Sequence, residues 1–115
     1  MSKSFRPVKE VWGESISEFV NIATLGDLLT SIAQEIGCEF FQSPYLNMEV
    51  FWIQDGYAFF EYIQDENKFN LQRAQELFPN ENKGDLESLI SNMQSLARIW
   101  YKSLESDGSI RFYMD

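Results

Sequence analysis

Carboxylates are the reactive groups that this chain carries in greatest number. Eleven of them fall between Glu10 and Glu66, a stretch that contains no lysine, arginine or histidine. The segment from Lys68 to Asp115 is nearly balanced, with six basic and seven acidic residues. The acidic excess behind the net charge of -9 therefore lies in the first part of the chain. An acid-only stretch of this length favours a surface that attracts a basic partner.

Carboxylate catalysis needs two acids placed at a defined separation. Glu49 and Glu61 fall on opposite strands and opposite faces of a predicted hairpin, so they form no acid and base pair. Asp65 and Glu66 are adjacent, but they lack the ligand spacing of a calcium loop and are expected to be solvated. We therefore predict no catalytic residue, and we expect that the chain is not an enzyme.

The other residue types of catalytic and metal sites are nearly missing. The chain has no histidine, which is the commonest general base and metal ligand. Cys38 is the single cysteine, so an intramolecular disulfide is impossible and a zinc site is not expected. We expect Cys38 to be buried and structural. No phosphate-binding glycine loop occurs, and no metal or cofactor is predicted.

Charge and hydropathy also bear on partners and location. The chain lacks the clustered lysine and arginine that hold a phosphate backbone, so direct nucleic-acid binding is not expected. No window approaches the roughly 18 apolar residues of a membrane span. The first residues carry charges without a following apolar run, unlike a secretory signal. These features predict no membrane association and a cytoplasmic location.

The length of 115 residues predicts a single domain over 1–115. Apolar residues recur at helical spacing over 25–36, 69–78 and 86–104, which predicts three amphipathic helices. Gly37 stands where a left-handed C-cap is expected, and Asp85 where an N-cap is expected. The alternation of Ile110, Phe112 and Met114 with polar or aromatic neighbours predicts a short C-terminal strand.

The segment over residues 15–23 has two readings. Ser15 and Glu18 form a capping-box pattern that predicts a short helix. The alternation of Ile16 and Val20 with polar residues leaves a strand open. Because the apolar phase changes before Leu25, we expect a kink or break near residues 24–26.

Asp55-Gly56 lies between two aromatic and β-branched runs, which predicts a β-hairpin over about 48–64. Pro44 indicates a loop before this predicted hairpin. The predicted fold is therefore α+β, with a small antiparallel sheet centred on this hairpin and packed with helices. Both hairpin faces are apolar, so each needs a cover. The helices 25–36 and 86–104 can cover both faces, or a partner covers one, and a second copy of the chain is one such partner.

The hairpin alternation places Phe51 and Phe60 on one face, which we expect under the helices, while the opposite assignment of the two faces stays open. It places Trp52, Tyr57 and Phe59 on the other face, nearer to a groove or a partner. Aromatic side chains supply the centres of many interfaces, and acidic rims steer basic partners. The predicted partner-binding residues are Trp52, Tyr57, Phe59, Phe60, Glu49 and Glu61.

We expect a non-catalytic acidic protein-interaction module, an adaptor or an assembly chaperone. It would bind a basic or extended segment of another protein through an apolar groove near the hairpin. The alternative is a small acidic inhibitor, such as an immunity, antitoxin or phage counter-defence protein. It would block a nucleic-acid enzyme by presenting carboxylates where phosphates bind.

Overall fold

The computed structural model describes residues 4–9, 16–17, 22–45 and 48–114. Its centre is a five-stranded antiparallel sheet with the strand order β2-β1-β5-β4-β3. The strands are β1 (Ser4–Pro7), β2 (Ile16–Ser17), β3 (Phe40–Tyr45), β4 (Met48–Ile53) and β5 (Ile110–Met114). The predicted α+β class and the predicted C-terminal strand are confirmed.

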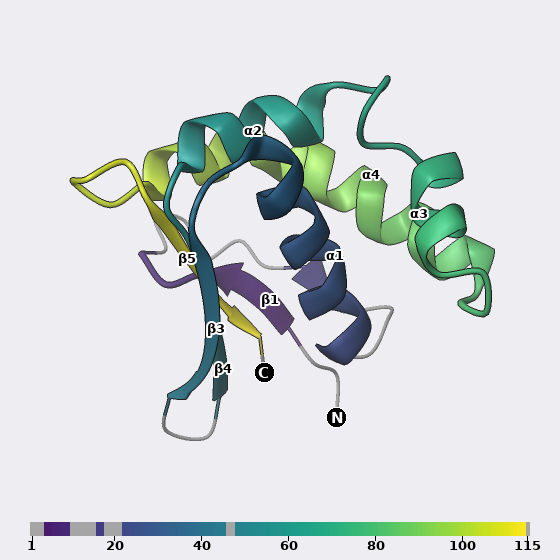
Figure 1. The fold of residues 1–115 in the computed structure, drawn as a ribbon, viewed down its shortest axis with the longest axis horizontal. Helices are drawn as coiled ribbons and strands as arrows, with labels where there is room; N and C mark the ends of the chain where they lie inside the picture. The colour runs from purple at the N-terminus through teal and green to yellow at the C-terminus, as the bar shows by residue number, and fades with distance from the viewer. Residues whose placement is uncertain (1–3, 10–15, 18–21, 46–47, 115) are drawn as a thin grey trace.

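The helices α1, α2 and α4 lie together on one side of this sheet (Figure 1). The helical elements are α1 (Ile22–Ile36), α2 (Gly56–Gln64), α3 (Leu71–Leu77), α4 (Lys83–Trp100) and the 3-10 helix η1 (Tyr101–Ser103). The helices predicted over 25–36, 69–78 and 86–104 correspond to α1, α3 and α4 with η1, and they are confirmed. Among the described residues, no helix lies on the opposite side of the sheet.

The predicted hairpin over 48–64 is wrong in its second arm. β4 ends at Ile53, and residues 56–64 form α2. The Asp55 carboxylate accepts a hydrogen bond from the Ala58 amide at 3.0 Å, so it caps a helix where we predicted a turn. Gly56, Phe59 and Ile63 are buried at helical spacing. The aromatic composition of the segment favours a strand, but burial of this helical stripe against the core decides for a helix.

The true hairpin precedes the predicted one. β3 and β4 are antiparallel neighbours, and their pairing runs from Phe40 opposite Ile53 to Tyr45 opposite Met48. Pro44 therefore lies inside a strand, where a loop was expected. β3 is the outermost strand of the sheet, and a proline is tolerated on an edge strand when its nitrogen points away from the neighbouring strand.

The predicted break near residues 24–26 is also wrong, because α1 continues through it. Gly26 is buried beneath the Gln42 side chain of β3, so the absence of a Cβ at this position lets α1 approach the sheet. Ile16 lies in β2, as the strand reading allowed, while Ser15 and Glu18 lie outside the described residues.

Of the two predicted helix caps, the one at Gly37 is confirmed and the one at Asp85 is wrong. Gly37 has a φ of 72°, and the amides of Gly37 and Cys38 donate to the carbonyls of Gln34 and Ala33, which is the predicted left-handed cap. α4 begins earlier than predicted. Its N-cap is Asn82, whose side chain accepts from the Asp85 amide at 3.2 Å.

Candidate functional site

One face of the sheet is free of helices in the described part of the chain, and we call it the open sheet face. Trp52 pairs with Arg111 across β4 and β5, and Val50 pairs with Tyr113. Because side chains alternate along a strand, these residues share one face, and Phe51, Ile53 and Phe112 lie on the face covered by helices. The open sheet face comprises Val8, Phe41, Ser43, Val50, Trp52, Arg111 and Tyr113.

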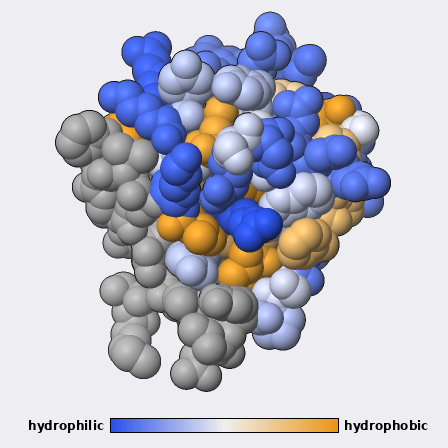
Figure 2. Space-filling view, turned by 90° about the vertical axis from the view of Figure 1, so that its left-hand side faces the viewer, coloured by the Kyte–Doolittle hydropathy of each residue, from blue (hydrophilic) through white to orange (hydrophobic). Residues whose placement is uncertain are grey.

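The aromatic part of the open sheet face lies at the sheet edge. The Phe41 and Trp52 rings stack with centroids 5.1 Å apart and planes 21° apart. Phe41 is on the outermost strand and is 47% exposed. Figure 2 views the side of the molecule where β3 and β4 lie, and apolar side chains interrupt its polar surface there. An exposed aromatic ring that stacks on a second ring at a sheet edge is the kind of side chain that anchors many protein interfaces.

A hollow of about 320 Å³ adjoins this aromatic pair. It is lined by Val8, Phe41, Ser43, Val50, Arg111 and Tyr113, all from the open sheet face. Val50 is buried at its floor, and Arg111 is exposed. The hollow therefore offers an apolar floor with one cationic group at its border.

Backbone groups at the same edge point outward. The Gln54 amide donates to the Glu39 carbonyl at 2.9 Å, so Glu39 and Gln54 form a hydrogen-bonded pair. Hydrogen-bonded and non-hydrogen-bonded pairs then alternate along β3 and β4 from this point. With the observed register, the amides and carbonyls of Phe40 and Gln42 point away from β4. At the next outward position, Pro44 has no amide to donate. Edge groups of this kind accept an additional strand in many peptide complexes.

Charge is unevenly distributed at the end of the sheet nearest the aromatic pair. Glu39 precedes β3 and Asp55 follows β4, and both are exposed. On the side of β1 and β5, Lys9 donates to the Leu104 carbonyl at 3.3 Å and Arg111 lies next to Trp52. The β3–β4 side of this end is therefore acidic, and the β1–β5 side is mixed.

Asp107 lies in the turn before β5. Hydrogen bonds from the hydroxyl and amide of Ser109, with a smaller contribution from the Arg111 charge, hold the pKa of Asp107 below its usual value. Asp107 thus remains ionised near Arg111 and partly offsets its charge. This offset limits the positive potential of the open sheet face.

The predicted partner-binding residues do not form one site. Trp52 lies on the open sheet face, whereas Glu49 points to the other side of β4. Tyr57 and Glu61 are exposed on α2, and neither lines the hollow beside Trp52. The expectation that Trp52 and Tyr57 lie nearer to the surface than Phe51 is confirmed.

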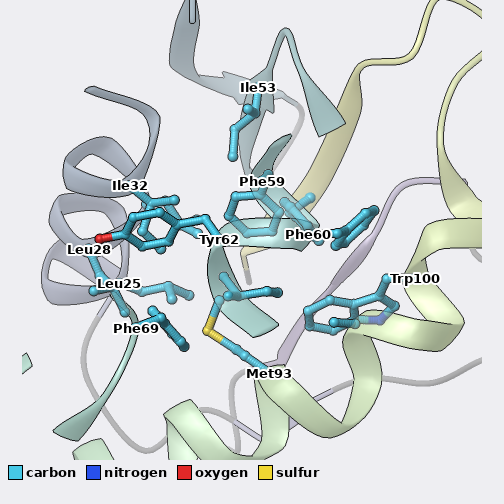
Figure 3. Close-up of a cluster of buried hydrophobic side chains, with 14 of the residues drawn as sticks. Leu25, Leu28, Ile32, Ile53, Phe59, Phe60, Tyr62, Phe69, Met93 and Trp100 are labelled. Carbon is cyan, nitrogen blue, oxygen red and sulfur yellow. The ribbon is translucent and has the colours of Figure 1, made fainter. Parts of the chain in front are cut away.

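Phe59 and Phe60 are core residues. Phe59 is 0% exposed and Phe60 is 5% exposed. Phe59 stands among Ile53, Tyr62 and Met93 in the interior (Figure 3), and its ring centroid lies 5.5 Å from that of Phe112. The burial of Phe60 agrees with the expectation. The expected exposure of Phe59 is wrong, because the segment is a helix, in which residues 59 and 60 can both face the core.

Phe41 and Arg111 are the surface residues that the sequence reasoning missed. Pro44 favours a loop after Phe41, although Phe41 and Ser43 alternate with Phe40 and Gln42 as in a strand. Arg111 was placed in a strand, but only the register shows that it pairs with Trp52.

The remaining polar clusters in the described residues serve structure. Tyr62 donates to the Glu35 carboxylate, and Arg73 forms an ion pair with the same carboxylate. This network joins α1, α2 and α3. Within the described residues, no three cysteine or carboxylate side chains come together as metal ligands. Cys38 is a free thiol, only partly buried against the core where full burial was expected.

No protein-family model, curated protein or solved structure matches this chain. None of the helices in the described ranges is long and apolar enough to cross a bilayer.

Proposed function

We propose that this chain is a non-catalytic protein-interaction module, an adaptor or assembly chaperone. It binds an extended basic segment of a partner protein along β3. The observation that carries this is the Phe41–Trp52 stack beside a hollow, in which Phe41 is exposed on the outermost strand β3 and Trp52 is partly exposed on the neighbouring strand β4. Its location is cytoplasmic, which accords with a single free cysteine.

The apolar part of the binding comes from the aromatic stack. A segment that pairs with the outward groups of Phe40 and Gln42 adds a strand to the sheet. Every second side chain of that strand then lies on the open sheet face, next to Phe41. Burial of the exposed part of Phe41 by such a side chain would contribute hydrophobic free energy at the centre of the contact.

Charge selects the chemistry of the partner. The exposed carboxylates of Glu39 and Asp55 lie beyond the end of β3 and β4, next to the aromatic stack. Lysine or arginine in the bound segment would meet these acids there. The net charge of -9 would also accelerate encounter with a basic partner at low salt.

Selection of random short peptides displayed on phage, with the whole chain as the target, tests this function. We expect the enriched peptides to combine lysine or arginine with apolar residues at alternate positions. Phe41→Ser should weaken their binding by about tenfold or more, which corresponds to about 1.4 kcal/mol. Leu77→Ser is the matched control, because Leu77 is 43% exposed on α3, and binding should not change.

Two results would overturn the proposal. One is an enriched set of acidic peptides. The other is equal binding by wild type and Phe41→Ser. The charge-mimicry alternative predicts a different outcome, in which the chain inhibits a nuclease or polymerase and Phe41→Ser leaves that inhibition intact.

A further inference from the structure

The face of α2 that meets α4 carries a second surface, which shares no lining residue with the hollow on the open sheet face. It is a groove of about 380 Å³ between α2 and the end of α4 with η1. The groove is lined by Tyr57, Phe60, Glu61, Gln64, Ala97, Arg98 and Tyr101. Phe60 and Ala97 are buried at its floor, whereas its rims are exposed.

Two tyrosines stand at one end of the groove. Tyr57 is 56% exposed and Tyr101 is 55% exposed. Their rings meet edge to face, with centroids 6.2 Å apart. Tyrosine is enriched at protein interfaces because its ring buries a large area while its hydroxyl can stay hydrated. The pair therefore offers an apolar contact that the fold itself leaves largely uncovered.

The charges on the groove differ from those on the rest of the molecule. Glu61 lies on the α2 rim and Arg98 on the α4 rim, so the lining residues carry one acid and one base. The chain as a whole carries twice as many acids as bases. Two copies of this acidic chain repel each other over most of their surfaces, but the lining of the groove carries no net charge.

We propose that the groove between α2 and α4 binds a second copy of this chain. A two-fold axis along the groove places α2 of one copy against α4 of the other. Glu61 then faces Arg98 of the second copy, and the same pair forms again on the other side of the axis. A partner in this groove needs a base opposite Glu61 and an acid opposite Arg98, and a second copy supplies both of them, so the lining is complementary to itself.

The same axis brings the tyrosines together. Tyr57 packs next to Tyr101 within one copy, so the axis gathers two such pairs at one end of the interface. The groove runs over about 10 Å of α2 between positions 57 and 64, at a rise of about 1.5 Å per residue. An interface of this length is small, so we expect a reversible dimer rather than an obligate one.

Sedimentation velocity over a concentration series tests the proposal by charge reversal. We expect the wild-type chain to shift reversibly from monomer to dimer. E61R and R98E should each weaken the dimer by about tenfold or more, because each creates two like-charge contacts. An equimolar mixture of E61R and R98E should associate again, since a heterodimer restores both opposite-charge pairs. The double variant E61R/R98E should also dimerise.

The controls are E76R on α3 and K83E at the start of α4, which make the same charge changes at exposed residues outside the groove. They should leave the monomer–dimer equilibrium close to that of wild type. Circular dichroism of each variant shows whether it is folded, and recovery in the mixture excludes simple misfolding of both single variants. A wild-type chain that stays monomeric at all concentrations, or a mixture that fails to associate, would overturn the proposal.

Discussion

Gly56 lies where three segments approach one another. Its amide donates to the Gly108 carbonyl at 2.8 Å, and a Cβ at this position would lie 2.9 Å from that carbonyl oxygen and would also overlap the Leu104 side chain. The sequence predicts that Gly56 lies in the turn of a hairpin. The structure gives it another role, which is to let the start of α2 contact the turn before β5.

Gly56→Ala should therefore destabilise the fold by about 1–3 kcal/mol, the usual cost of inserting a methyl group into a packed site. Leu104 can move, but the Gly108 carbonyl cannot do so without losing its hydrogen bond. Gly84→Ala is the control, because Gly84 is exposed in α4 and its new Cβ would meet only the Asn82 side chain. Urea unfolding measures both, and a loss no larger than that of Gly84→Ala would contradict the close contact.

Tyr62 gives the fold a dependence on alkaline pH. Burial, with a smaller contribution from the Asp65 charge, raises the pKa of Tyr62 above the ordinary value of 10.0. The folded state thus favours the neutral phenol, whose hydroxyl points toward α1 (Figure 3). This contribution is fully present below about pH 10 and is lost as pH rises through the higher pKa of the folded state.

Tyr62→Phe should start with a lower free energy of unfolding, because the hydrogen bond to Glu35 is lost. It should then lose less stability than wild type as the pH is raised above 10. Denaturant unfolding at a series of alkaline pH values measures this difference. Parallel curves for wild type and Tyr62→Phe would show that Tyr62 is not the titrating group.

At the scale of the element, α2 depends on its first turn. Asp55 accepts from the Ala58 amide, and the helix that follows has only nine residues. A helix this short is marginal by itself, so its cap and its buried face together hold it in place. The same nine residues carry Phe59 into the core and Tyr57 and Glu61 to the groove.

Asp55→Ala should cost about 1 kcal/mol of stability, since it leaves the first amides of α2 without this acceptor. Asp55→Asn should retain most of that stability, because an asparagine oxygen accepts the same hydrogen bond. Asp27→Ala, at an exposed acid within α1, should change stability by less than Asp55→Ala. Thermal or urea unfolding distinguishes the three, and equal effects of Asp55→Ala and Asp27→Ala would contradict the capping role.

At the level of the whole molecule, the helices cover one face of the sheet, and in the described ranges no helix covers the open sheet face. Dimerisation through the groove would leave two open sheet faces exposed, one on each copy. A partner with two basic segments would then bind with higher avidity than a partner with one. The two proposed surfaces are thus compatible in one assembly.

The layered arrangement predicts opposite results for two aromatic substitutions. Phe59→Ala should cost about 3–5 kcal/mol of stability, because it leaves a cavity in the core. Phe41→Ala should cost much less, because nearly half of that side chain is already exposed. Thermal melts of the two variants check this, and similar losses would show that Phe41 is packed as closely as Phe59.

Local sequence patterns were enough to predict the amphipathic helices, the C-terminal strand and the acidic excess of the first part of the chain. The stripe over 25–36 and the αL glycine at Gly37 are local patterns, and local hydrogen bonding and burial of one face are enough to express them. Absence of histidine is likewise a property of composition. None of these features depends on which strands become neighbours in the sheet.

The conformation of residues 48–64 and the composition of the open sheet face depend on contacts between distant parts of the chain. A run such as Tyr57–Gln64 satisfies strand propensity and helical periodicity together, and its choice depends on the core that α1, α4 and β5 build around Phe59. Trp52 lies beside Phe41 and Arg111 because β3 and β5, which are about 70 residues apart in the chain, both pair with β4. Pairing between distant strands is decided by the free energy of the assembled core, which no local pattern records.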